Sequence, residues 1–70
     1  MYRYSVVRGY SVYAQFTDFD TLDSATKFFL RKREIYVNGG DAGMRWIELI
    51  GFDPARGIIR LAFYTVENSI

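Results

Sequence analysis

The side chains that most often carry out enzymatic chemistry are missing from this sequence. It contains no His and no Cys, so the commonest general acid–base group and the most nucleophilic side chain are both absent. Ser5, Ser11, Ser24 and Ser69 therefore have no imidazole to activate them. An enzyme built on this chain would need two carboxylates that converge in a pocket. We expect instead a protein that binds a partner, with no catalytic residue and no cofactor.

Three acidic residues, Asp18, Asp20 and Asp23, lie close together in the sequence. Carboxylate oxygens bind hard cations, but this spacing is not that of an EF-hand loop. Short acidic side chains also cap helices and interact favourably with the positive end of the helix dipole. A helical pattern starts at this point, so the second role fits better and the sequence predicts no metal site.

Arginine dominates the basic residues, since seven of the nine are Arg and only Lys27 and Lys32 are Lys. Arg forms planar, bidentate and stacked contacts that Lys cannot form, and with aromatic residues it is enriched at binding hot spots. Genomic base composition explains such an excess equally well. The residues that we predict to contact a partner are Arg31, Lys32, Arg33, Arg45, Arg60 and Tyr64.

Basic residues interleaved with aromatic ones also suggest a nucleic-acid-binding sheet, on which bases would stack. The candidate platform consists of Arg3, Arg45 and Arg60 with Tyr13, Trp46 or Tyr64. However, the net charge is only +1 and the isoelectric point about 8.0, whereas backbone binding requires several phosphates to be neutralised. A nucleic-acid partner is therefore the alternative, and a protein partner is the first expectation.

A chain of 70 residues forms one domain with a small core. Of these residues 50% are hydrophobic and 19% aromatic, so a compact core is feasible without disulfides or metals. There is neither a secretory leader pattern nor an apolar run of the roughly 20 residues that cross a bilayer. The sequence predicts a single domain over residues 1–70, a cytoplasmic location and no membrane partner.

The N-terminal segment has the alternating pattern of a strand over residues 2–16. Arg8-Gly9 interrupts this alternation. Arg-Gly is a poor two-residue hairpin turn, so we expect one strand that bends at Gly9 rather than two short strands.

A helix is predicted over about residues 21–34, with Asp20 or Thr21 as its N-cap, because a short side-chain oxygen satisfies free backbone N–H groups. Its buried stripe consists of Leu22, Ala25, Phe28 and Phe29. The basic run 31–33 falls in the last predicted turn, where positive charge suits the negative end of the helix dipole.

Two further strands are predicted over residues 44–50 and 58–66, separated by a turn signal in which Pro54 and Gly57 suit the second and last positions. The element order predicts an α+β fold of β-α-β-β type, in which one helix covers one face of a three-stranded antiparallel sheet.

The strand over residues 44–50 is apolar on both sides. Whichever face the helix covers, Trp46 or Ile47 then lies on the far face, and exposed apolar surface often marks a binding site. We expect the far face to be a homodimer interface or the partner site, rimmed by Arg45, Arg60 and Tyr64.

The predicted layout resembles that of small phage-encoded β-α-β-β proteins. The segments that carry the resemblance are residues 19–28, FDTLDSATKF, and residues 44–49, MRWIEL, between an opening strand and a final aromatic strand. Some anti-CRISPR inhibitors of multisubunit type I systems share this layout. The resemblance implies a small non-enzymatic inhibitor that binds a crRNA-guided surveillance complex in the host-cell cytoplasm, and it transfers no individual binding residue.

Overall fold

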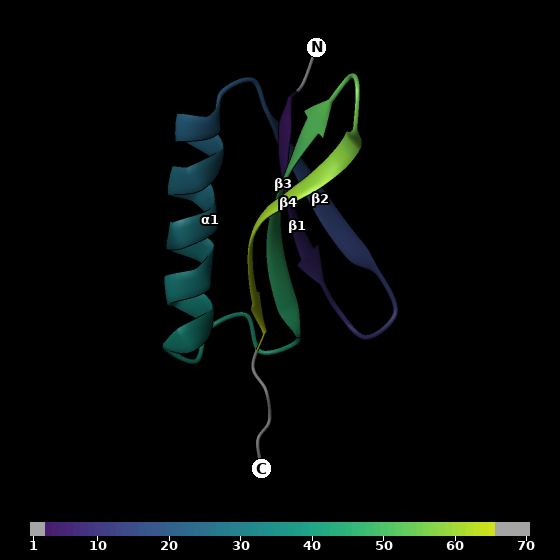
Figure 1. The fold of residues 1–70 in the computed structure, drawn as a ribbon. Coiled ribbons are helices and arrows are strands. Elements are labelled where there is room, and N and C mark those ends of the chain that lie inside the picture. Colours follow the sequence, from purple (N-terminus) through teal and green to yellow (C-terminus); the bar gives the residue numbers. More distant parts are fainter. Residues whose placement is uncertain (1–2, 66–70) are drawn as a thin grey trace.

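The structure, a computed structural model, describes residues 3–65, which form one helix and four strands. In chain order these are β1 (Tyr4–Gly9), β2 (Ala14–Phe19), α1 (Leu22–Val37), β3 (Trp46–Asp53) and β4 (Gly57–Thr65). The strands form a single antiparallel sheet in the order β2-β1-β3-β4, and α1 lies against one face of it (Figure 1). The predicted α+β class is confirmed, but the sheet has four strands rather than three.

The additional strand comes from the N-terminal segment, where the prediction of one bent strand over residues 2–16 is wrong. The chain turns through residues 10–13, and β2 then pairs with β1 along its whole length. The N–H of Tyr10 donates to the carbonyl of Tyr13 at 2.8 Å, and the two rings stack with their centroids 4.7 Å apart. A longer loop closed by stacked aromatics thus replaces the unfavourable Arg-Gly turn. Tyr2 lies outside the described residues.

Helix α1 begins at the predicted place but ends later than predicted. The hydroxyl of N-cap Thr21 accepts a hydrogen bond from the N–H of Ser24 at 3.2 Å, which confirms one of the two predicted caps. The helix continues to Val37 because Tyr36 extends its inward-facing stripe and meets Tyr64 of β4 edge-on at 6.2 Å. The basic run 31–33 therefore lies before the last turn, and its predicted place at the helix end is wrong.

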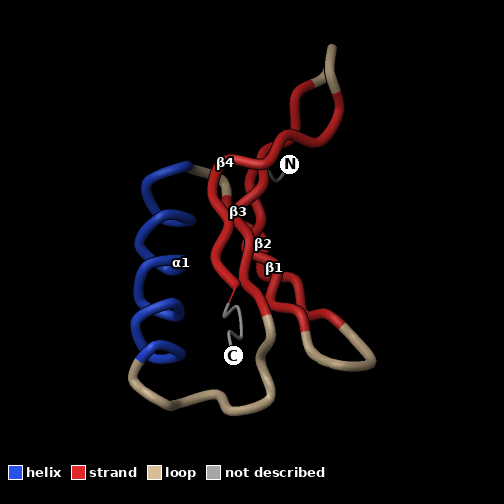
Figure 2. Tube along the Cα trace, turned by 60° about the horizontal axis from the view of Figure 1, so that its bottom comes forward, coloured by secondary structure: helices blue, strands red, loops and turns tan. Residues whose placement is uncertain are grey.

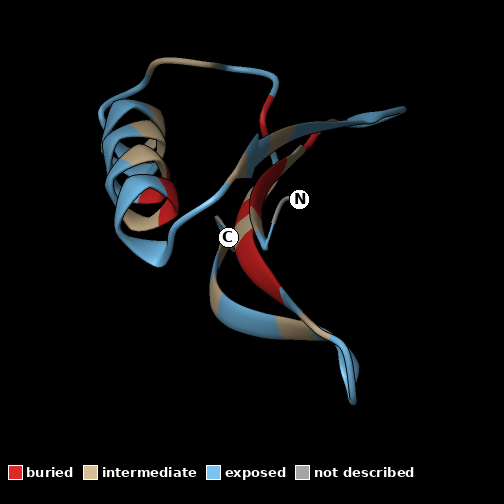
Figure 3. Ribbon diagram, turned by 90° about the horizontal axis from the view of Figure 1, so that it is seen from above, coloured by how far each residue is buried: buried red, intermediate tan, exposed pale blue. Residues whose placement is uncertain are grey.

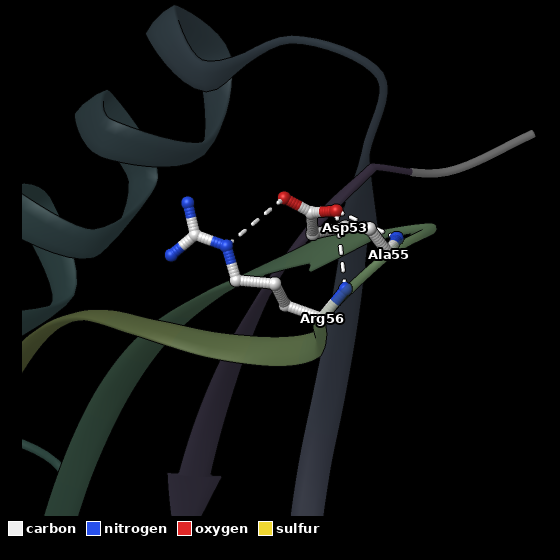
Figure 4. A network of polar contacts seen from close by, with 3 residues as sticks. All are labelled: Asp53, Ala55 and Arg56. Atoms are coloured by element: carbon white, nitrogen blue, oxygen red, sulfur yellow. Dashed lines mark hydrogen bonds and ion pairs between the residues drawn. The ribbon is translucent and has the colours of Figure 1, made fainter.

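Strands β3 and β4 form the predicted hairpin around a turn that Asp53 stabilises (Figure 4). Its Oδ1 accepts hydrogen bonds from the N–H groups of Ala55 and Arg56 at 2.7 and 3.2 Å, and its Oδ2 pairs with Arg56 Nε at 3.9 Å. Gly57 has a φ of 86°, which glycine adopts without strain. Strand β3 starts at Trp46 rather than at residue 44, and Val66 lies outside the described residues.

The hydrophobic core lies between α1 and the sheet. Its buried members are Val6, Ala25, Phe29, Met44, Ile47 and Leu49. Figure 3 shows the buried positions at the middle of the sheet and on the side of α1 that faces it, with the hairpin ends exposed. Within the predicted stripe Ala25 and Phe29 are buried and Phe28 is half-buried, whereas Leu22 is exposed. Phe19 from β2 packs on Phe28 instead, with ring centroids 5.2 Å apart.

The two hairpin turns lie at opposite ends of the sheet, and a loop crosses from the end of α1 back to β3 (Figure 2). The hydroxyl of Tyr10 donates to the carboxylate of Asp41 at 2.9 and 3.1 Å, which ties this loop to the end of β1. Within residues 3–65, α1 is neither long nor apolar enough to cross a membrane.

Candidate functional site: the open face of the sheet

The face of the sheet opposite α1, called the open face below, carries side chains from all four strands. Side chains alternate between the two faces along each strand, so the register assigns every position to a face. The open face consists of Ser5, Val7 and Gly9 from β1, Ala14, Phe16 and Asp18 from β2, Trp46, Glu48, Ile50 and Phe52 from β3, and Ile58, Arg60, Phe63 and Thr65 from β4.

The centre of the open face is buried although no helix or strand within residues 3–65 covers it. Val7 and Ile50 are only 4% and 5% exposed. Trp46 contributes to this burial because its indole lies flat over Gly9, where even one added carbon would overlap the ring. The indole also stacks on Phe63 with a centroid distance of 6.2 Å. Glycine at residue 9 is thus what allows the indole to lie along the sheet.

Around this centre the open face presents large apolar side chains to solvent. Phe16 and Ile58 are each 64% exposed, and Phe52 and Phe63 are each 43% exposed. The four come from β2, β3 and β4, so they span the width of the sheet. Exposed apolar side chains gathered on one face are typical of surfaces that bind other molecules.

The charged groups of the open face are satisfied within the face itself. Arg60 Nε donates to Glu48 Oε2, and the guanidinium carbon of Arg60 lies 4.2 Å from the centroid of Phe63. The Ser5 hydroxyl donates to Asp18 Oδ1. An apolar partner that covers this face therefore leaves the Arg60–Glu48 ion pair intact and the Asp18 carboxylate hydrogen-bonded to a neutral hydroxyl. A phosphate would meet an arginine that is already neutralised.

The predicted contact residues do not gather on one surface. Arg60 belongs to the open face, but Tyr64 lies on the other face, between Tyr36 and Arg33, whose guanidinium carbon is 5.6 Å from the Tyr64 ring. Arg31, Lys32 and Arg33 belong to α1, on the covered side. Arg45 is exposed just before β3, and its charge acts on Tyr36 of α1. The expected rim of Arg45, Arg60 and Tyr64 is therefore wrong as a single surface.

A β-bulge explains why Arg60 and Tyr64 separate. The alternation along the last strand placed both residues on one face, but the register shifts between Leu49 and Ile50, which oppose Ala62 and Arg60. Leu61 is the extra residue, and one extra residue moves all later side chains to the opposite face. Phe63 consequently joins Arg60 on the open face. Sequence reasoning missed Phe63 and Phe16, whose only signal was their place in aromatic strands.

Several cations on the covered side, Arg8 and Lys32 among them, have no ion pair within residues 3–65. Arg8 and Lys32 flank the ring of Phe28, with the guanidinium carbon and the ammonium nitrogen 5.7 and 5.3 Å from its centroid. The ion pairs found among residues 3–65 involve Lys27, Arg56 and Arg60, and neither of these two cations. The Nε of Arg8 is buried without a hydrogen-bond partner. Unpaired positive charge is thus found beneath α1 and not on the open face.

Two tyrosines on the covered side have shifted pKa values. Burial and the hydrogen bond to Asp41 raise the pKa of Tyr10, and burial together with Tyr64 raises the pKa of Tyr36. Both shifts favour the neutral hydroxyl. Both hydroxyls therefore stay protonated at neutral pH, and neither shift prepares its group for proton transfer there.

Four shallow depressions on the described part of the chain are each lined by a single carboxylate residue: Glu34 in two of them, Glu48 in the third and Asp53 in the fourth. One depression on the open face is lined by Trp46, Glu48, Arg60 and Phe63, so it contains one carboxylate beside its own counter-ion. Within residues 3–65 no group of three or more potential metal ligands is close enough to hold an ion. Comparison with known protein families, curated proteins and solved structures finds no match to this chain.

Proposed function

We propose that this protein is a non-enzymatic binding module, an inhibitor or adaptor, that docks a partner protein on the open face of its sheet. The observation that supports this proposal is the group of exposed apolar side chains, Phe16, Phe52, Ile58 and Phe63, around a buried apolar centre, on a face where Arg60 is paired with Glu48 and Asp18 is hydrogen-bonded to Ser5. The exposed apolar side chains gain free energy when a partner removes them from water.

The chemistry of the open face favours an apolar protein surface as the partner. Aromatic residues and arginine are enriched at the centres of protein interfaces, where charged residues are otherwise depleted. Here Trp46, Phe63 and Arg60 form one stacked group. We expect this group to be the anchor of the contact, with Phe16 and Ile58 at its margins.

The resemblance to anti-CRISPR inhibitors makes a type I crRNA-guided surveillance complex the first partner to test, and it places the proposed action in the host-cell cytoplasm. The chain has one strand more than the β-α-β-β layout on which that resemblance rests. The experiment is to mix the protein with a panel of type I complexes and to follow their binding of target DNA. Failure to associate with any of them would remove the anti-CRISPR version of the proposal.

A pair of matched variants tests the open face itself. Phe63→Ala removes an open-face side chain that is 43% exposed, and Leu30→Ala removes an α1 side chain that is 47% exposed. If the open face docks the partner, Phe63→Ala weakens binding by about tenfold or more, as hot-spot truncations do, while Leu30→Ala leaves it unchanged. Equal effects of the two substitutions would contradict the proposal.

Nucleic-acid binding is the alternative, and the unpaired cations Arg8 and Lys32 are the observation that favours it. It predicts an affinity for labelled single- or double-stranded oligonucleotides that falls steeply with salt, because bound counterions are released. Replacing Lys32 by Gln should then weaken binding, and replacing Arg60 should not. A flat titration at low salt would remove this alternative.

A further inference from the structure

Strand β2 lies at the edge of the sheet, and the pairing with β1 determines which of its residues point their backbone N–H and C=O groups outward. In an antiparallel pair, residues alternate between those that bond to the neighbouring strand and those whose N–H and C=O point away. The bond from Tyr10 to Tyr13 shows that even-numbered residues of β1 bond to β2, through Gln15 and Thr17. The outward-pointing backbone groups of β2 are therefore those of Ala14, Phe16 and Asp18.

The hydrogen bonds on the β3 side of β1 independently indicate the same alternation. The N–H of Phe52 donates to the carbonyl of Arg3, just before β1, at 2.9 Å, and the N–H of Arg45 donates to the carbonyl of Gly9 at 2.8 Å. The carbonyls of odd-numbered residues therefore point to β3. Even-numbered residues of β1 are then left for β2. Within β1 the two ladders agree, although just before it the N–H of Arg3 donates to the carbonyl of Phe19 in β2 at 3.2 Å. Strand β2 therefore presents outward-pointing backbone donors and acceptors at Ala14, Phe16 and Asp18.

The two edges of the sheet differ in how they are protected against pairing. Natural edge strands usually carry prolines, bulges or basic residues that prevent another strand from pairing with them. Strand β4 has such devices, since Leu61 forms a bulge and Arg60 lies beside it. Strand β2, with the sequence AQFTDF, contains no proline, glycine or basic residue, and its pairing with β1 is regular throughout. Its one charge, on Asp18, is bonded inward to Ser5.

We propose that β2 pairs with β2 of a second copy of this chain, antiparallel about a two-fold axis at Phe16, to form a continuous sheet across the dimer. In this register Phe16 faces Phe16 of the second copy, and the outward groups of Ala14 face those of Asp18. All three outward residues of each strand find backbone partners. No charge faces a like charge, and the small Ala14 leaves room beside the carboxylate.

This self-complementarity is what selects a second copy over an unrelated extended peptide. In an isologous contact each residue of the strand meets its symmetry mate across the axis. In AQFTDF the exposed Phe16 then meets its own copy, and the single charge, on Asp18, lies two residues from the axis, opposite Ala14 and away from the second Asp18. The pairing goes beyond the proposed function and does not depend on it. A two-fold axis perpendicular to the sheet also leaves both open faces on the same side, with the two Phe16 side chains at their junction.

Hydrogen exchange followed by NMR tests the pairing on the intact chain, with sedimentation velocity as a measure of mass. The amides of Phe16 and Asp18 are free in a monomer and bonded in the dimer, whereas the amide of Thr17 bonds to β1 in both. We expect a dimer at high concentration, in which exchange at Phe16 and Asp18 slows by about tenfold or more on association, with Thr17 unchanged.

The variant Phe16→Pro removes one outward donor without touching the bonds to β1, and edge positions of this kind tolerate proline. We expect it to remain folded and monomeric, while Phe16→Ala, which keeps the N–H, still dimerises. A strict monomer of the unmodified chain would overturn the proposal, as would a dimer in which Phe16 and Asp18 stay unprotected. Protection of these amides by an added AQFTDF peptide without self-association would assign the edge to an extended peptide instead. None of these outcomes depends on binding at Phe63, which tests the open face separately.

Discussion

The two faces of the sheet are built from the same strands, yet their apolar side chains are buried in different ways. On the covered face Val6 and Ile47 are completely buried because α1 lies over them. On the open face Val7 and Ile50 are almost as buried, although no helix or strand within residues 3–65 lies over them. The helix thus buries the covered face as a core. The open face is buried only at its centre, and the side chains at its margin stay exposed.

This difference shows how a short chain can have both a buried core and an exposed apolar face. The covered face has exchanged its apolar contact with water for contact with α1, which is the main source of stability in a domain of this size. The exposed apolar side chains of the open face are still in contact with water. Each large side chain that a partner buries there can still contribute about 1.5–3 kcal/mol before the costs of association.

The largest expected effect is a difference in the free energy of unfolding between a variant of the covered face and a variant of the open face. Ile47→Ala should lower the free energy of unfolding by about 2–5 kcal/mol, because α1 cannot collapse into the cavity. Ile50→Ala should cost clearly less, because the exposed side chains around it and water can fill the space. Urea unfolding of both variants measures the difference. Equal losses would mean that the open face is packed like a second core.

A smaller effect is expected at Gly9, where the open face depends on the close approach of Trp46. Gly9→Val should lift the indole from the sheet, cost about 1–3 kcal/mol of stability and shift tryptophan emission to the red. Gly43→Ala is the matched control, because an added methyl there lies 3.5 Å from the Tyr10 ring, an ordinary contact distance. An unchanged emission spectrum in Gly9→Val would show that Trp46 does not lie over residue 9.

The next effect belongs to the covered side and depends on pH. Tyr10→Phe removes the hydrogen bond to Asp41 and should cost about 0.5–1.5 kcal/mol at neutral pH. The pKa of Tyr10 is raised above its ordinary 10.0, so its contribution is complete below pH 10.0 and is lost as pH rises through the higher folded value. Denaturation across this range should show stability falling more steeply in the unmodified chain than in Tyr10→Phe. Parallel curves would contradict the shift.

The smallest effect is expected for the ion pair of the open face. Arg60→Gln should lower stability by only about 0.2–1 kcal/mol, because the Arg60 side chain is 58% exposed and water screens the pair. Thermal unfolding at low and high salt measures this, and the difference from the unmodified chain should shrink with salt. Arg56→Gln, which weakens a longer and more exposed pair, should change still less. A loss of several kcal/mol at Arg60 would mean that Glu48 is left as a buried charge.

The features that the sequence determined by itself are those governed by a few neighbouring residues. The cap at Thr21, the left-handed exit at Gly57 and the buried pair Ala25 and Phe29 follow from side-chain oxygens, allowed φ values and helical spacing. The apolar character of residues 44–50 on both sides also predicted that Trp46 or Ile47 would lie on the far face, and Trp46 does. These signals need no knowledge of distant parts of the chain.

Only the tertiary structure decided how many strands the sheet has and which residues share its open face. The loop over residues 10–13 forms because β2 gains a full ladder with β1, and α1 extends to Val37 because Tyr36 finds Tyr64. The bulge at Leu61 depends on how β4 pairs with β3, and it alone places Phe63 beside Arg60 and sends Tyr64 beneath α1. Register is a property of two paired segments, so the alternation of one strand read alone could not assign these side chains to their faces.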